Sequence, residues 1–372
     1  MPTTTPNPPQ IPVAGSGSTA VASQPKVLAF SAAAFKLPNL ETNAAASGIA
    51  FGSTWKGKID PNGYLGNLSI RVTASGGSGS TTPAVAAADA PWNVIQSFAL
   101  MLPGGTKPII QLDGYQLYLA GWLGGYRKPN PATLPSYQAV GTGGDFQCTF
   151  FIPIEIIMRN ALGALSNTNG TSLFQVIITF APAATVYSTV PVPTVPTLAV
   201  ETHSENYSVP RPQSSTGVEQ ATAPPMLGTT QYWTSQESPS LSGFAAYPST
   251  RTGLAIRNFI LVTRNAGVRS AGLPSPFAVA LNNTDIYPLI TPEWLIDKNM
   301  EWYGDTLPTG VYVLPRCLDL DGSPGEELRN NWIPTTTGDK LTFGGTWASG
   351  TTLEVITNDV APAGDYLQRQ EL

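Results

Sequence analysis

The sequence predicts an all-β protein made of two copies of one β-domain in tandem. Three observations predict it. Short segments that alternate apolar and polar residues recur along the chain, Gly and Pro are frequent (36 and 35 of 372 residues), and segments of the first half return in order in the second. Because Gly and Pro interrupt helices and form turns, a chain rich in both is typical of β architecture.

The first half contains four segments with the two-residue period of a strand. They are residues 67–74, 146–153, 172–182 and 197–204. In the first of them Leu68, Ile70 and Val72 alternate with polar residues, which predicts one buried and one exposed face. Strands at this spacing, with turns between them, favour a sandwich or barrel over alternating strands and helices.

Four segments of the first half recur in the second half in the same order. The pairs are 97–105 with 258–267, 109–122 with 279–289, 146–156 with 311–320, and 174–182 with 353–362. Their alignment pairs Phe98 with Phe259, Tyr115 with Tyr287, Pro153 with Pro315, and Val176 with Val355. The offsets differ, which indicates loops of different length on a shared strand order. Any two sandwiches share loosely similar strands, but the preserved order favours a duplication.

The composition changes along the chain predict its divisions. A polar, Pro-containing stretch without periodicity covers residues 210–230 and marks the boundary between the copies. The expected parts are an extended N-terminal arm (1–30), a first domain (31–212), a linker (213–230), a second domain (231–365) and a C-terminal tail (366–372).

Three segments predict helices. Residues 290–304 have Thr291 as a helix N-cap, Pro292 at the first helical position and Glu293 in the first turn. Residues 113–125 are the counterpart of this helix in the first half, and residues 154–165 are a third candidate. Most Trp residues fall inside such strand and helix patterns, Trp294 among them, which predicts burial in a core or in a subunit interface.

The charge content excludes some classes of function. Charged residues are only 12% of the chain, the net charge is −5, and Lys and Arg form no cluster. Nucleic-acid binding requires clustered cations, so direct contact with nucleic acid is not expected. A low share of charged residues suits a protein that covers much of its surface with partners. The N-terminus lacks the pattern of a signal peptide, and Pro or polar residues interrupt every long apolar stretch.

The residue types that carry catalysis are scarce. His203 is the only histidine, and Glu201 and Glu205 share its strand face, which predicts a solvated row of charges. Cys148 and Cys317 lie in apolar strand-like segments and are expected to be buried thiols. We therefore expect no enzyme activity, no catalytic residues and no cofactor.

One acidic turn could hold a cation. Asp319, Asp321 and Glu326 surround a Gly-containing turn that resembles an incomplete calcium loop. Gly322 comes two residues earlier than the calcium-binding loop requires. The sequence leaves two alternatives open, a weak cation site and an ordinary acidic hairpin turn.

Several longer segments resemble one family. Residues 329–362 (RNNWIPTTTGDKLTFGGTWASGTTLEVITNDVAP) resemble the last strands of double jelly-roll major capsid proteins from tailless, internal-membrane icosahedral bacteriophages of the tectivirus type. Residues 252–267, 281–304 and 308–322 resemble the second jelly roll of that group, and WNVIQSFALMLPGG (92–105) resembles part of the first. The resemblance covers roughly residues 50–365, and its specificity lies in the order and tandem arrangement of the segments.

The resemblance implies a fold and an assembly. The fold would be two tandem eight-stranded jelly rolls with a few short helices. Three chains would form a pseudo-hexagonal homotrimer, and trimers would tile an icosahedral shell around a membrane vesicle that contains DNA. The loops at 76–91, 126–143 and 233–252 would be candidates for outward projections.

The resemblance also implies partners and a location. The partners would be other copies of the chain, neighbouring trimers, penton and minor capsid proteins, and the membrane through the arm at 1–30. The protein would be located in the outer capsid shell of a virion that assembles in the host cytoplasm.

Two other functions remain open. A receptor-binding spike trimer also uses β-rich domains, but such proteins usually carry one head on a fibrous shaft. A carbohydrate-active β-sandwich protein would need a pair of catalytic acids, and nothing among the 24 acidic residues singles out a pair.

Overall fold

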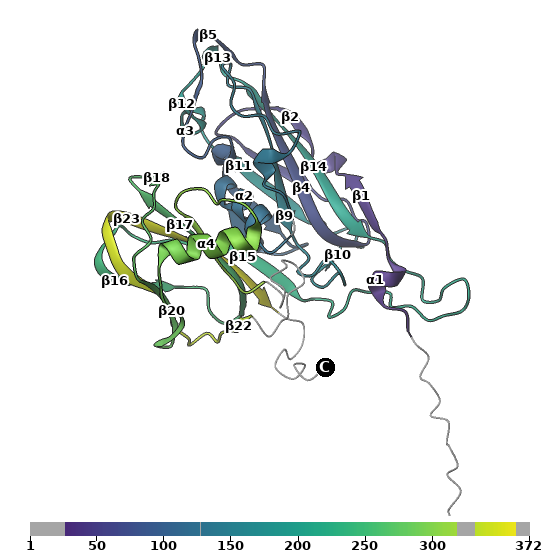
Figure 1. The fold of residues 1–372 in the computed structure, drawn as a ribbon. Helices are drawn as coiled ribbons and strands as arrows, with labels where there is room; N and C mark the ends of the chain where they lie inside the picture. The colour runs from purple at the N-terminus through teal and green to yellow at the C-terminus, as the bar shows by residue number, and fades with distance from the viewer. Residues whose placement is uncertain (1–26, 127, 318–331, 362–372) are drawn as a thin grey trace, which may run out of the picture.

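The computed structural model describes residues 27–126, 128–317 and 332–361, and strands dominate it (Figure 1). They form two lobes that lie side by side. The first lobe runs from β1 to β14 (Lys36–Tyr207) and the second from β15 to β23 (Thr230–Ala361). Most of the expected arm, residues 1–26, and the expected tail, 366–372, lie outside the described residues.

The elements of the first lobe follow in chain order. They are α1 (Phe30–Ala33), β1 (Lys36–Leu40), η1 (Thr42–Ala44), β2 (Ala46–Ile49), β3 (Thr54–Lys58), β4 (Tyr64–Ser75), β5 (Ser78–Thr82), β6 (Val85–Ala86), η2 (Trp92–Val94), β7 (Ile95–Met101), β8 (Pro108–Leu112), α2 (Gly114–Leu123), η3 (Pro131–Thr133), β9 (Phe146–Pro153), β10 (Leu165–Ser166), β11 (Gln175–Phe180), α3 (Ala183–Val186), β12 (Tyr187–Thr189), β13 (Val192–Thr194) and β14 (Thr197–Tyr207).

The second lobe has fewer elements. They are β15 (Thr230–Glu237), β16 (Leu241–Ser249), β17 (Ala255–Asn265), β18 (Val268–Arg269), β19 (Phe277–Leu281), β20 (Thr284–Ile290), α4 (Pro292–Tyr303), β21 (Val311–Pro315), β22 (Ile333–Pro334) and β23 (Leu341–Ala361).

The first lobe is a jelly roll. One sheet has the antiparallel order β1-β14-β4-β9, and the facing sheet has the order β3-β11-β7-β8. With the eight main strands lettered B to I along the chain, these are the B-I-D-G and C-H-E-F sheets of a jelly roll. The apolar face of each strand is buried between the sheets, as the alternating pattern of Leu68, Ile70 and Val72 predicts.

The second lobe has the same topology. The long strand β23 serves both of its sheets: its first half pairs with β16 and β19, and its second half pairs with β15 and β17. Gly350 has a left-handed backbone (φ 81°) where the strand passes from one sheet to the other. With β20 beside β19 and β21 beside β17, the sheets again have the B-I-D-G and C-H-E-F orders. The predicted double jelly roll is confirmed.

A shared irregularity fixes the correspondence between the lobes. In β4 the register skips Gly66, so that Asn67 faces Glu205 while Leu65 faces Asn206. In β17 the register skips Arg257 at the same point, between partners Asn358 and Asp359. Beyond the bulge, Asn67 pairs with Pro153 and Asn258 pairs with Pro315. A bulge at one position in both copies is a strong sign of common construction, since bulges are specific features of a fold.

The residue alignment expected from the sequence is only partly correct. The pair Pro153 and Pro315 is confirmed. Phe98 lies in strand E (β7), whereas Phe259 lies in strand D (β17). The counterpart of Phe98 is Phe277, because Phe98 pairs with Leu112 on strand F as Phe277 pairs with Ile290.

The other two pairs are wrong for a related reason. Tyr115 lies in α2 but Tyr287 lies in a strand, and Val176 lies in strand H whereas Val355 lies in strand I. Every strand of a jelly roll carries the same apolar alternation, so local likeness cannot tell one strand from the next.

Two of the three predicted helices are confirmed, as α2 and α4. Residues 154–165 are not helical. Ala161 and Gly163 have positive φ angles (59° and 85°), and the N–H of Ile156 donates to Leu162 O (2.7 Å), which closes a turn. The segment is a buried turn, so its apolar residues face the core without a helical period. Residues 233–252 are also not a projecting loop, because β15 and β16 occupy them.

Helices α2 and α4 occupy equivalent places, each between strands F and G of its lobe. A Cβ on Gly121 of α2 would lie 2.5 Å from the carbonyl oxygen of Phe151 in strand G. In α4 the corresponding residue is Asn299, whose side chain donates to Val313 O (2.9 Å) and accepts from Val313 N (2.9 Å). Helix α2 is therefore fixed to its strand by close approach, and α4 by a pair of hydrogen bonds.

Gly121→Ala is expected to lower the free energy of unfolding by about 1–3 kcal/mol, because the added methyl group overpacks the helix against backbone. Chemical denaturation of both variants checks this, with Gly338→Ala as the matched control, since a Cβ there meets nothing within 4 Å. Equal stabilities for the two variants would contradict the close approach.

Candidate assembly surface

Helix α2 connects the two lobes. Asp113 caps it: its side chain accepts from Gln116 N, and the Gln116 side chain accepts from Asp113 N. All ten residues of the helix are buried. A helix that is apolar on every side needs cover on every side. Strands β7 and β9 cover one side and the second lobe covers the other.

The second lobe meets α2 with the outer face of its B-I-D-G sheet. Buried apolar side chains of this face belong to the same core as α2 itself. They are Trp233, Ile260, Val262, Val311, Val313 and Ile356. This contact extends the core of the first lobe onto the outer face of the second lobe's sheet, and burial there contributes roughly 1.5–3 kcal/mol for each large side chain.

Polar contacts fix the direction of α2 along β17. At the end of the helix, Asn258 Nδ2 donates to Leu123 O (3.0 Å) and Arg257 Nη1 donates to Gly124 O (2.8 Å). At its start, the ring of Tyr115 lies beside the guanidinium of Arg264, 5.6 Å from its centroid. The helix therefore runs along β17 from Arg264 to Asn258.

An ion cluster joins the lobes near Tyr115. Asp89 of the first lobe binds Arg264 (2.6 Å) and Arg269 (2.5 Å) of the second, and Arg264 also binds Glu354 (2.6 Å). Burial raises the pKa of Glu354 to about 7, despite the attraction of Arg264. Burial likewise raises the pKa of Asp113 to about 6.

The sheets are also joined across the lobes. Strand β8 of the first lobe pairs in parallel with β15 of the second, with Ile110 facing Trp233 and Gln111 facing Thr234. The C-H-E-F sheet of one lobe thus continues into the B-I-D-G sheet of the other. Backbone pairing, apolar packing and ion pairs therefore all join the two lobes.

Helix α4 has the same position in the second lobe, and no described segment buries its outer side. Thr291 caps its start and Gly304, with φ 68°, ends it. Leu295 is buried in the core of the second lobe. The outer side exposes large apolar residues: Trp294 (43%), Ile296 (49%) and Met300 (48%). The sequence predicts that Trp294 is buried in a core or in a subunit interface. Trp294 is exposed in the single chain, so a subunit interface is the place where it would be buried.

Among the described residues, the middle of the outer face of the first lobe's B-I-D-G sheet is partly exposed and polar. Arg71 forms an ion pair with Glu201, and Glu201 binds His203 Nε2 (2.6 Å). Glu205 lies on the same face, 3.5 Å from Lys36 Nζ. The predicted row of charges around His203 is confirmed. The hydrogen bond from His203, followed by that from Arg71, lowers the pKa of Glu201.

The remaining expectations concern metals and thiols. Asp319, Asp321 and Glu326 lie outside the described residues. Within the described residues, no three His, Cys, Asp or Glu side chains are grouped so that they could hold a metal ion. Cys148 and Cys317 are buried and form no disulfide, as expected, and burial raises the pKa of the Cys148 thiol.

None of the helices in the described ranges is long and apolar enough to span a bilayer.

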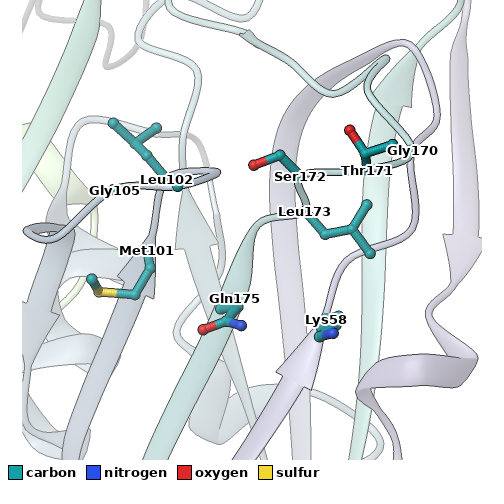
Figure 2. Close-up of a pocket in the computed structure, with 10 residues that line it drawn as sticks. Lys58, Met101, Leu102, Gly105, Gly170, Thr171, Ser172, Leu173 and Gln175 are labelled. Carbon is teal, nitrogen blue, oxygen red and sulfur yellow. The ribbon is translucent and has the colours of Figure 1, made fainter.

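A pocket of about 460 Å³ lies at one end of the first lobe, between the β7–β8 turn and the segment before β11 (Figure 2). Lys58 is the one ionisable residue among those that line it. Its other lining residues are Gly, polar or apolar, so the pocket contains no acid–base pair for catalysis.

Comparisons with known proteins support the fold. No protein-family model and no curated protein sequence matches the chain. Among solved structures, the major capsid protein of Sulfolobus Turreted Icosahedral Virus is similar, with a TM-score of 0.63 and 12% identity over 91% of this chain and 100% of that one. The major capsid protein P2 from Bacteriophage PM2 is similar with a TM-score of 0.53 and 11% identity, over 89% of this chain and all of P2.

A third similar structure is VP54 of PBCV-1, with a TM-score of 0.56 and 10% identity over 88% of this chain and 94% of VP54. The similarities span both lobes, at sequence identities too low for a sequence match. The chain therefore has the double jelly-roll fold of viral major capsid proteins.

The pH dependence of stability tests the burial of Glu354. A carboxyl pKa raised on folding gives a stability contribution that is complete below the unfolded pKa and lost as the pH rises through the folded value of about 7. Glu354→Gln resembles the protonated acid. Its stability relative to the parent is expected to improve by up to about 3 kcal/mol between about pH 5 and pH 8. Denaturation curves across this range check it, and parallel pH profiles would contradict it.

Proposed function

We propose that the chain is a structural major capsid protein that forms pseudo-hexagonal homotrimers. The observation that carries the proposal is the presence of two jelly rolls of one topology, side by side in one chain, with the fold of viral major capsid proteins. Three such chains place six similar lobes in a ring. A threefold unit with a nearly sixfold outline tiles a flat facet, which suits an icosahedral shell.

The uncovered surfaces of the chain support self-association. Helix α4 exposes Trp294, Ile296 and Met300, whereas its counterpart α2 is wholly buried. Exposed apolar patches with a polar rim are typical of protein interfaces. Neighbouring trimers, penton proteins and minor capsid proteins are the further partners that we propose.

The shell would enclose a membrane vesicle that contains the DNA. The net charge of −5 suits a shell that does not contact the DNA itself. Helix α1 lies at the end of the first lobe opposite to β5 and β13 (Figure 1). We propose that the end with α1, to which the arm is attached, faces the membrane and that β5 and β13 face outward. Assembly would occur in the host cytoplasm.

The role is structural and not catalytic. The described residues contain the single histidine on an exposed sheet face, held by Glu201, and the pocket of the first lobe has no paired acid. No site among the described residues specifically supports the two alternatives, a receptor-binding spike and a carbohydrate-active protein.

The mass of the purified chain in solution tests the proposal. A stable species of three times 39.2 kDa is expected by native mass spectrometry and by light scattering. A chain that stays monomeric at every concentration tested, or a dimer, would contradict the trimer and with it the tiling.

A further inference from the structure

We propose that the outer side of α4 docks on the outer face of the β1-β14-β4-β9 sheet of a second copy, with Asp297 facing Arg71. The inference rests on the proposed trimer and names the two surfaces that build it. It uses the contact between the lobes of one chain as a template for the contact between chains.

The two helices can be aligned from their caps. Asp113 and Thr291 are the N-caps of α2 and α4. Counting from them, Leu117 corresponds to Leu295, and Gly121 corresponds to Asn299. Both leucines are fully buried in their own lobes. Gly121 and Asn299 both meet strand G, at Phe151 and Val313. The alignment is therefore supported on the inner side of each helix.

The same alignment compares the outer sides. The α2 positions that share a face with Tyr115 recur three and four residues apart. These positions, with their α4 counterparts, are Tyr115 with Glu293, Tyr118 with Ile296, Leu119 with Asp297, and Trp122 with Met300. All four residues of α2 are buried and all four of α4 are exposed. On this face of α4, two apolar and two acidic residues stand where α2 has four buried residues, of which Tyr115 meets Arg264 and Arg269 of the second lobe.

The sheets can be compared through the shared bulge. Asn67 and Asn258 correspond, and every second residue from there points to the same face. The apolar residues that cover α2 therefore have the following counterparts on the first lobe: Ser69 for Ile260, Arg71 for Val262, Thr149 for Val311, and His203 for Ile356. The sheet that would receive α4 is polar, with a cation near its centre.

The template brings one pair of opposite charges together. Arg71 already binds Glu201, and Glu205 lies on the same face, so Asp297 would join an existing ion pair. In the template, α2 runs along β17 from Arg264 at its start to Asn258 at its end. Leu119 lies midway along that path, so its counterpart Asp297 would lie near Arg71 on the second copy. Opposite charges that meet in an interface fix its register and disfavour wrong partners. The apolar residues Ile296 and Met300 would lose their exposure in the same contact.

A charge exchange tests the docking. Arg71→Glu and Asp297→Arg are each expected to raise the concentration at which the trimer half-dissociates by about tenfold or more, because like charges then face each other. The double variant Arg71→Glu/Asp297→Arg is expected to restore most of the loss. Lys56→Glu is the matched control, since Lys56 is exposed on β3 in the opposite sheet and its exchange should leave the trimer unchanged.

A second measurement separates folding from docking. Ser69→Cys combined with Ile296→Cys should give disulfide-linked dimers and trimers on a non-reducing gel, because each link would join two chains. The native Cys148 and Cys317 are buried and serve as the background in the parent chain. A parent trimer with no such links, and with no rescue in the charge exchange, would overturn the docking alone. A monomeric parent would overturn both the docking and the proposed trimer.

Discussion

The burial of α2 between the lobes is the constraint on which the rest of the structure depends. Every residue of this helix is buried and most are apolar, so the first jelly roll on its own would expose an apolar side to water. The second lobe supplies the missing cover with the apolar outer face of its sheet. The second jelly roll therefore does more than repeat the first, because its sheet covers the apolar side of α2 and completes the core of the first lobe.

The outer faces of the two B-I-D-G sheets correspond in position but differ in chemistry. Inside the chain the covering face is apolar and its acid, Glu354, has a raised pKa because it is buried. On the first lobe the counterpart of Glu354 is Glu201, which is half-buried and has a lowered pKa beside His203 and Arg71. Burial is the main cause of the raised pKa of Glu354, whereas the hydrogen bonds from His203 and then Arg71 are the main causes of the lowered pKa of Glu201. A residue on a surface that must remain soluble before assembly keeps its charge and its partners.

The fold class followed from local patterns, but the strand correspondence did not. Alternation of apolar residues predicts strands, and the cap at Thr291 predicts α4, since both signals lie within a few residues. The bulge at Gly66 and Arg257 depends on pairing with a distant strand, which no local signal reports. The turn at 154–165 resembles a helix in sequence because most of its apolar residues are buried whatever their spacing, so burial does not show the period that distinguishes a turn from a helix. For the assembly surface, the sequence predicts only that Trp294 is buried in a core or in an interface, because an apolar residue in a helix fits both.

Backbone pairing is a further difference between the contact that joins the two lobes and the contact proposed between two chains. Trp233 pairs with Ile110 and continues the sheet from lobe to lobe. Its counterpart on the first lobe is Pro38, since Pro38 faces Glu205 as Trp233 faces Asn358. Proline has no N–H to donate, so β1 cannot continue a neighbouring sheet at this position. In the proposed docking, side-chain contacts would therefore replace backbone pairing at this position.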